Sequence, residues 1–330
     1  MRGASRLATI GSLLAAVALA VLAAGAWTKP AALAVTPSSP SIDDDLDAWL
    51  ASRELSAASD YAIIPGAEKR VRWYASQPGT RTETVVVYLH GFSATRQEVA
   101  PLGEQLADAL QANLFETRLA GHGRETGALA NVSAEDWMAD AAEALAVGRR
   151  LGDRLVVVGT STGATLALAA ADLEDFASVE SLILISPNFS PKGDSADFLL
   201  RPFGPPLARL VAGETRTWTA ANDQQERYWS TTYPMDAVVE MMRLVGRVRD
   251  QLPMTLQTDI LVLYSDSDQV IDVPAIKRSM ESIEARRVEL QEVGESGDPS
   301  NHVLAGDILS PETTAPTVQR ILSFLGKAAQ

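Results

Sequence analysis

The chain has 330 residues, of which 46% are hydrophobic and 21% charged, so it is long and apolar enough to bury a large core. It carries 28 Lys and Arg against 42 Asp and Glu, a formal net charge of −14, and has no basic run, so we expect no nucleic-acid partner. There is no cysteine, and the three histidines lie far apart in the sequence. This composition excludes a disulfide framework and a Cys nucleophile, and we expect no metal or other cofactor.

Residues 1–29 form an apolar segment that predicts export. Arg2 and Arg6 precede the run 7–27, which contains no charged residue. Small-residue motifs near its end suit cleavage of a signal peptide, whereas the length of the run suits a retained anchor that would contact the membrane. Positive charge before the run places the remaining chain outside the cytoplasm in both cases, either anchored in the inner membrane and facing the periplasm, or soluble in the periplasm or secreted.

Residues 30–45 are rich in Pro, Ser and Ala and end in three acidic residues, which predicts a tether. Leu46, Trp49, Leu50 and Leu55 then recur at near-helical spacing. We expect a short amphipathic helix that docks on the main domain, because its acidic polar face is unsuited to a membrane surface.

The body of the chain, 46–330, alternates short apolar runs with helical stretches. The runs expected to form strands are 71–75, 84–90, 113–118, 154–159, 181–186, 259–264 and 288–293. Residues 95–111 have a helical period, and Ser133 opens a helix that continues to about Gly152. This alternation predicts an α/β fold with a mostly parallel sheet covered by helices on both faces. About 70 residues separate two late runs, which predicts an inserted cap over about 188–250.

A Gly-x-Ser-x-Gly motif joins a predicted central strand to a helix. It reads Gly159-Thr160-Ser161-Thr162-Gly163. A serine hydroxyl becomes a useful nucleophile when a sharp strand-to-helix turn exposes it beside a base, and the tight turn leaves no room for a Cβ at the two glycines. We therefore predict Ser161 as a nucleophile.

The sequence His90-Gly91-Phe92 ends another predicted strand. Where a serine nucleophile lies at a strand-to-helix turn of an α/β sheet, the amide that follows it commonly binds the oxyanion together with a second amide from a loop after a neighbouring strand. The amides of Phe92 and Thr162 are therefore predicted to hold a developing oxyanion. Loss of one such donor typically costs about 3 kcal/mol of transition-state binding. His90 precedes the serine, so we expect it to shape this loop rather than act as a base, and we expect His122 to pack a loop near the site entrance.

The acid and the base are expected from the last quarter of the chain. Asp266, Asp268 and Asp272 follow a late predicted strand and could orient an imidazole. Asp268 is the first choice because the chain turns away from the sheet edge directly after it, and Asp266 is the second. His302 is the sole histidine downstream, which makes it the predicted base. The order Ser161, Asp268, His302 is the one expected of this fold.

The motifs HGF, GHG, GTSTG, SDSDQV and NHV resemble those of bacterial alpha/beta hydrolases of the monoacylglycerol lipase, carboxylesterase and serine aminopeptidase group, over roughly residues 60–326. Thr fills both variable positions of the serine motif, where many lipases have His at the first. The resemblance implies an alpha/beta hydrolase fold with a nucleophile, an orienting acid, a general base and two oxyanion amides at Ser161, Asp268, His302, Phe92 and Thr162.

We expect a serine hydrolase that cleaves an ester with a short or medium acyl chain, in a small-molecule or lipid-like substrate. Two alternatives stay open. A serine aminopeptidase would need an acidic group near the cap to bind a substrate ammonium, for which Glu214, Asp223 and Glu226 are candidates. A tethered, non-catalytic binding protein could also use the same fold.

Overall fold

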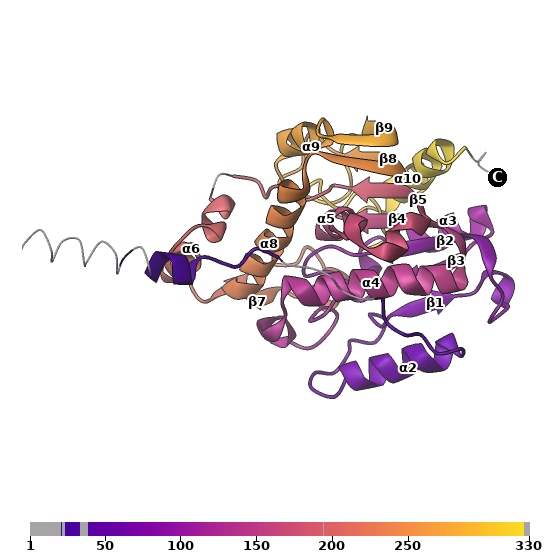
Figure 1. Ribbon diagram of the computed structural model, residues 1–330, viewed down its shortest axis with the longest axis horizontal. Helices are drawn as coiled ribbons and strands as arrows, with labels where there is room; N and C mark the ends of the chain where they lie inside the picture. The colour runs from indigo at the N-terminus through magenta and orange to yellow at the C-terminus, as the bar shows by residue number, and fades with distance from the viewer. Residues whose placement is uncertain (1–20, 22–23, 34–38, 194, 327–330) are drawn as a thin grey trace, which may run out of the picture.

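A sheet of seven strands runs through the protein, whose computed structural model describes residues 21, 24–33, 39–193 and 195–326 (Figure 1). The strand order is β1-β3-β2-β4-β5-β8-β9, and a separate antiparallel pair joins β6 to β7. Within the large sheet β1 pairs antiparallel with β3 and the other pairs are parallel. The sheet is therefore mostly parallel, as the sequence predicts. The strands are β1 (Arg70–Arg72), β2 (Thr82–Leu89), β3 (Asn113–Glu116), β4 (Gly152–Thr160), β5 (Val179–Ile185), β6 (Thr215–Thr217), β7 (Thr232–Pro234), β8 (Met254–Tyr264) and β9 (Ile283–Glu292).

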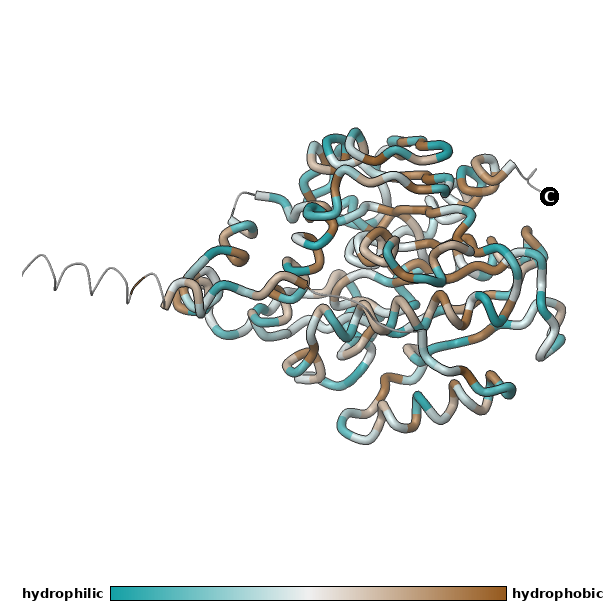
Figure 2. The backbone as a smooth tube through the Cα atoms, viewed as in Figure 1, coloured by the Kyte–Doolittle hydropathy of each residue, from teal (hydrophilic) through white to brown (hydrophobic). Residues whose placement is uncertain are grey.

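Helices cover both faces of the sheet. They are α2 (Leu46–Ala57), α3 (Leu102–Leu110), α4 (Ala134–Leu151), α5 (Thr162–Ala169), α6 (Gly204–Ala212), α7 (Asp223–Tyr228), α8 (Met235–Gln251), α9 (Val273–Met280) and α10 (Pro311–Phe324). Because side chains alternate along a strand, Val85 and Val87 of β2 pack with α4 and α5, whereas Val86 and Tyr88 pack with α3 and α10. The strands are accordingly apolar on both faces, and they form much of the brown tube in Figure 2.

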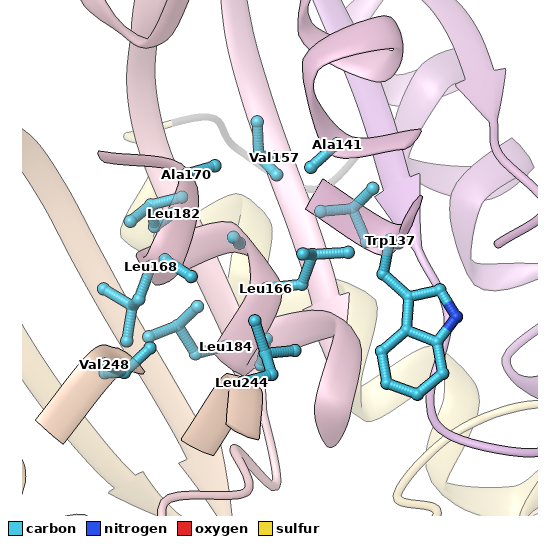
Figure 3. Packing of buried hydrophobic residues seen from close by; sticks show 14 of the residues in the cluster. Trp137, Ala141, Val157, Leu166, Leu168, Ala170, Leu182, Leu184, Leu244 and Val248 are labelled. Carbon is cyan, nitrogen blue, oxygen red and sulfur yellow. The ribbon is translucent and has the colours of Figure 1, made fainter. Parts of the chain in front are cut away.

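The short helix α5 is buried between the sheet and α8. Leu166 and Leu168 of α5 are fully buried, and Figure 3 shows them between side chains of the sheet, such as Leu184, and Leu244 and Val248 of α8. A helix covered on both sides holds its first residue firmly. That residue follows Ser161 directly.

Local signals in the sequence set two helix boundaries. Ser133 caps α4, with its side chain accepting from the Asp136 amide and the Asp136 side chain accepting in return, and the helix ends at Leu151, as predicted. The stretch 95–111, whose sequence has a helical period, is not one continuous helix. It divides into a 3-10 turn at Arg96–Glu98 and α3, because Pro101 lacks an amide hydrogen and precedes the first turn of α3.

The predicted amphipathic helix α2 docks on the main domain. Asp45 caps it by accepting from the Ala48 amide, and Leu46, Trp49 and Leu50 are buried. Ion pairs add to this contact. They join Arg53 to Glu143 at 2.8 Å and Glu54 to Arg118 at 2.8 Å. Leu55, predicted on the apolar face, is instead 77% exposed.

The segment between β5 and β8 contains a 3-10 turn at Ala196–Leu200, then α6, β6, α7, β7 and α8. In Figure 1 α6 lies at one end of the molecule, away from the sheet. The helix α8 contacts both the main core and the cavity described below. Leu244 and Val248 pack on α5, whereas Val238 and Met241 line the cavity.

The apolar run predicted to direct export lies largely outside the described residues. Its described end, residues 24–28, is helical and contacts the region before α6, where the Phe203 amide donates to Thr28 Oγ1 at 2.9 Å. In the described part of the chain, no helix has the length and apolar character to span a membrane. Residues 30–33 and 39–45, within the segment predicted as a tether, lack regular structure, and Leu33 is buried in the main core.

Candidate active site

Ser161 lies at a sharp turn between β4 and α5. Its φ is +53° and its ψ is −116°, a backbone conformation that non-glycine residues rarely adopt. A Cβ on Gly163 would come within 2.1 Å of the Leu89 carbonyl oxygen, and one on Gly159 within 2.7 Å of the Ala164 Cα. The two glycines are therefore required by backbone that cannot move aside, as the motif predicts.

Asn188, just after β5, is hydrogen-bonded to the turn at Ser161 and to α5. Its amide donates to the Ser161 carbonyl oxygen at 3.3 Å, and its own carbonyl oxygen accepts from Thr165 Oγ1 at 2.7 Å. The Ser161 amide donates to the Ile185 carbonyl oxygen at 2.8 Å. The strained conformation is thus held by hydrogen bonds from the neighbouring strand and the loop after it.

The structure brings Asp268 and His302 together from different loops. The His302 Nδ1–H donates to Asp268 Oδ2 at 2.8 Å, and both side chains are buried. The other carboxylate oxygen of Asp268 accepts from the amides of Val270 at 2.7 Å and Ile271 at 3.1 Å. These two amides fix the carboxylate while it fixes the imidazole, which leaves Nε2 of His302 as the ring nitrogen available for proton transfer.

The other two acidic candidates lie elsewhere. Asp266 is 61% exposed and pairs with Lys277 at 3.1 Å, and Asp272 precedes α9 and pairs with Arg278 at 3.0 Å. Neither contacts His302. The first choice made from the sequence, Asp268, is therefore the aspartate that the fold places against the imidazole.

The loop that carries His302 is held by Asp298. One of its carboxylate oxygens accepts from the amides of His302 at 3.0 Å and Val303 at 2.9 Å. Ser186, after β5, donates its hydroxyl to the His302 carbonyl oxygen at 2.7 Å. Hydrogen bonds to Asp298 therefore hold this loop internally, and the hydrogen bond from Ser186 holds it to the edge of the sheet.

Two opposing effects set the pKa of His302. Burial lowers it, but the hydrogen bond and the charge of Asp268, with the charges of Glu98 and Asp298, raise it more, so the pKa lies above the ordinary 6.5. The carboxylates around the ring thus favour the imidazolium that forms when His302 accepts a proton.

The candidate oxyanion amides lie at the ends of two adjacent strands. Phe92 follows β2, and Thr162 is the first residue of α5, where the positive end of the helix dipole favours a negative charge. In the described part of the chain, neither amide donates to a protein acceptor. Both residues line one cavity with Ser161 and His302.

His90 and His122 do not belong to the described lining of the cavity, so neither is placed to act as a base there. The Nδ1–H of His90 donates to the Gly91 carbonyl oxygen at 2.9 Å, and its Nε2 accepts from the Leu119 amide at 3.0 Å. Burial lowers the pKa of His122 to about 4, and its ring packs edge-on against Phe92 with the centroids 5.8 Å apart. Both imidazoles support the loop that carries Phe92.

The cavity has a volume of about 550 Å³. Its walls come from the loops at the carboxyl ends of the parallel strands, from α8 and from the segment that contains β6, α7 and β7. Aromatic and apolar side chains form much of the lining, among them Phe92, Trp218, Trp229, Tyr233 and Met241. Arg216 on β6 also lies on the wall.

Acidic groups at the cavity differ from those expected for an aminopeptidase. Glu214, Asp223 and Glu226 are exposed and do not belong to the lining in the described part of the chain. The acidic residues that line the cavity are Glu98 and Asp298. Among the described residues, no three His, Cys, Asp or Glu side chains group so that they could hold a metal ion.

Sequence reasoning missed three residues that shape this site: Glu98, Asn188 and Asp298. Asn188 follows a predicted strand by two residues, and Asp298 precedes His302 by four in a turn-forming stretch, so position alone could have indicated both. Glu98 is harder to identify as a site residue from the sequence, because a charged residue in a stretch with a helical period normally faces water.

A family model described as serine aminopeptidase, S33, matches residues 80–295. No curated protein matches the sequence at a significant level.

Solved structures confirm the fold. One, from a study of LipS and LipT, two metagenome-derived lipolytic enzymes, superposes with a TM-score of 0.64 at 19% identity and covers 80% of this chain and 99% of its own. A monoacylglycerol lipase from Paleococcus ferrophilus gives 0.57 at 15% identity, with 78% of this chain and 97% of its own covered. A soluble variant of monoglyceride lipase from Saccharomyces cerevisiae gives 0.56 at 13%, with 82% and 95% covered. Since the family model spans more than half of the sequence and the fold agrees, the chain belongs to the serine aminopeptidase S33 family of the alpha/beta hydrolase superfamily.

Proposed function

We propose that the protein is a serine hydrolase that cleaves a carboxylic ester, with Ser161 as nucleophile, His302 as general base and Asp268 as the acid that orients it. One observation carries this proposal. The His302 Nδ1–H contacts Asp268 Oδ2 at 2.8 Å, while His302 and Ser161 line the same cavity. The hydrogen bond selects the tautomer in which Nε2 can accept a proton.

The reaction then proceeds in two steps. Ser161 Oγ forms a bond to the acyl carbon as Nε2 of His302 takes its proton. The tetrahedral intermediate breaks its bond to the alcohol oxygen, which leaves with the proton from His302. Water, deprotonated by the same imidazole, attacks the acyl carbon. The bond from that carbon to Ser161 Oγ then breaks, Oγ takes the proton back from His302, and the acid leaves. Throughout, the charge of Asp268 stabilises the imidazolium.

The negative oxygen of each tetrahedral intermediate would be held by the amides of Phe92 and Thr162. Free amides already pointed at the developing charge stabilise it without rearrangement, which is commonly the largest single contribution in such sites. The position of Thr162 at the start of α5 adds the partial positive charge of the helix end.

An ester with a short or medium apolar acyl chain fits this site best. A cavity of about 550 Å³ lined by aromatic and apolar side chains can enclose such a group and exclude water from it. The family description makes peptide-bond cleavage the competing activity. The exposed positions of Glu214, Asp223 and Glu226 favour the ester, since none of these carboxylates belongs to the described cavity lining where a substrate ammonium would bind.

Covalent labelling tests the proposed nucleophile. A fluorophosphonate probe should phosphonylate Ser161 Oγ of the full chain with loss of fluoride, and the Ser161→Ala variant should stay unlabelled. A panel of aryl esters with increasing acyl length, one ester with a carboxylate on its acyl end, and amino-acid arylamides would then define the substrate. An unlabelled wild-type protein without turnover would support the non-catalytic binding protein instead.

The pH dependence follows from the raised pKa of His302. Only the neutral imidazole can accept the proton of Ser161, so kcat/KM should fall about tenfold per pH unit as the pH drops below that pKa. Because the pKa lies above 6.5, the midpoint of this acid limb is expected above pH 6.5. The measurement is kcat/KM for an aryl ester from pH 5 to 9. A midpoint well below 6.5 would contradict the arrangement of carboxylates around the ring.

We also propose that residues 1–29 export the protein and, where they are retained, anchor it. The support is the charge pattern of Arg2 and Arg6 before the apolar run, together with the 90% exposure of Trp27 at its described end. Mass spectrometry of the amino terminus of the exported protein would distinguish a cleaved signal peptide from a retained anchor. Recovery of the whole protein in the cytoplasm would contradict export.

A further inference from the structure

Glu98 is a buried carboxylic acid at the candidate active site that no step above uses. It ends the 3-10 turn Arg96–Glu98, its side chain lines the cavity with Ser161 and His302, and the residue is 2% exposed. Carboxylates are rarely buried so completely without a specific function or partner. Its position therefore requires an explanation.

One oxygen of this carboxylate holds the loop after β2. Glu98 Oε2 accepts from the Gly91 amide at 2.8 Å and from the Tyr88 hydroxyl at 2.8 Å. The carboxylate also packs closely against the Cα of Gly91, because a Cβ on Gly91 would lie 2.7 Å from Glu98 Oε1. Glycine at this position thus allows the carboxylate to reach the backbone.

The two peptide units around Gly91 are each fixed by a buried side chain. Glu98 holds the Gly91 N–H, and His90 holds the Gly91 carbonyl oxygen. The Phe92 N–H belongs to the same peptide unit as that carbonyl and, in a trans peptide, points the opposite way. Rotation of the Gly91–Phe92 unit would therefore reorient the Phe92 N–H, and the contact from Glu98 fixes the peptide unit next to it.

Burial, hydrogen bonds and nearby charged groups all shift the pKa of Glu98. Burial raises its pKa to about 7, the hydrogen bonds from Gly91 and Tyr88 and the charge of His302 lower it, and the charge of Asp298 raises it. Glu98 in turn raises the pKa of His302, as do Asp268 and Asp298. Because the folded state raises this pKa from 4.5, the carboxyl lowers the stability of the fold as the pH rises from about 4.5 through about 7.

We propose that Glu98 is a positioning residue of this site: its carboxylate fixes the Gly91 amide, and with it the Phe92 N–H aimed at the developing oxyanion, and places a negative charge near His302. This inference rests on the proposed serine hydrolase. Glu98 touches no reacting atom and acts through the loop and the imidazole.

Glu98→Gln separates the charge from the hydrogen bonds. The amide oxygen of Gln can still accept from Gly91 and Tyr88, so kcat at pH 8.5 should stay within about threefold of wild type. Without the negative charge the pKa of His302 falls, so the acid limb of kcat/KM should move to lower pH, by up to about one unit. The melting temperature at pH 8 should rise, because a buried charge has been removed. An unmoved acid limb would overturn the electrostatic part of the proposal.

Glu98→Leu removes the acceptor as well. We expect kcat to fall about 10- to 100-fold with KM within about threefold, because a misplaced Phe92 amide weakens binding of the transition state rather than of the ester. Circular dichroism and the melting temperature verify that the variant is folded. A folded Glu98→Leu enzyme with wild-type kcat would refute the positioning role, and recovery of kcat in the Gln variant would support it.

Glu116→Gln is the matched control. Glu116 on β3 is also buried and burial raises its pKa to about 7, but it pairs with Arg70 and is not part of the described cavity lining. Its pH profile should match that of wild type. Turnover and labelling of the wild type keep the two hypotheses apart: an inactive, unlabelled wild type rejects the proposed function, whereas an active wild type with insensitive Glu98 variants rejects this inference alone.

Discussion

Asp268→Asn should lower kcat for an ester by about 10⁴-fold while the fold and the melting temperature change little. The Asn side chain can present its NH₂ to His302, which favours the tautomer with the proton on Nε2. In that tautomer Nε2, the proposed proton acceptor, already carries a proton and cannot act as a base. The imidazolium would also lose the carboxylate that contacts it at 2.8 Å.

The control for this variant is Asp266→Asn, two residues earlier on the same loop. Asp266 is largely exposed and pairs with Lys277, so its replacement should leave kcat within about twofold of wild type. The measurement is steady-state kinetics of both purified variants on one aryl ester at pH 8.5. If Asp266→Asn were the inactive variant and Asp268→Asn retained activity, the assignment of the acid would be wrong.

Lys69→Met should destabilise the protein by about 3–5 kcal/mol. The Lys69 ammonium is buried and contacts Asp140 at 3.1 Å and also Glu143. Removing it leaves two carboxylates close together in the interior, with Arg53 at the rim as the remaining cation on Glu143. The free energy of unfolding, measured by urea titration at pH 8, gives the cost.

The loss should depend on pH. Burial already raises the pKa of Asp140, and the charge of Lys69 partly offsets this effect. Without Lys69 the pKa rises further, so the variant should be least stable at high pH and should recover stability as the pH falls toward 5 and the carboxyl is protonated. Arg154→Met, which removes a half-exposed cation paired with Glu83, should cost less than about 1 kcal/mol. Equal stability of both variants would show that the Lys69 cluster contributes little.

The Lys69 cluster also bears on the candidate site. Asp140 accepts from the Ala120 amide at 2.6 Å, and the Ala120 carbonyl oxygen accepts from Trp137 Nε1 at 3.0 Å and contacts Nδ1 of His122 at 2.9 Å. His122 packs against Phe92. A continuous series of contacts therefore links Lys69 to the Phe92 side chain through Asp140, Ala120 and His122.

Short-range patterns predicted much of the architecture, and two expectations failed for different reasons. The central strands β2, β4 and β5 were evident because they are apolar on both faces, and α4 because Ser133 and Asp136 form a capping box. The stretch 95–111 has a helical period that continues across Pro101, but the structure divides it there into a 3-10 turn and α3. Leu55 was placed on the buried face of α2, but the main domain covers only the side with Leu46, Trp49 and Leu50.

The sequence by itself determined which residue types could perform the proposed chemistry and where they stand along the chain. They are a serine in a Gly-x-Ser-x-Gly motif at a strand end, and one histidine downstream of the loop that carries the candidate aspartates Asp266 and Asp268. This was possible because turn geometry and strand burial are local properties. Only the tertiary structure decided between Asp266 and Asp268 and revealed that Glu98 is buried beside His302. Those facts depend on where loops from β2, β8 and β9 meet at one edge of the sheet, and a contact between residues 34 or more positions apart leaves no periodic trace in either segment.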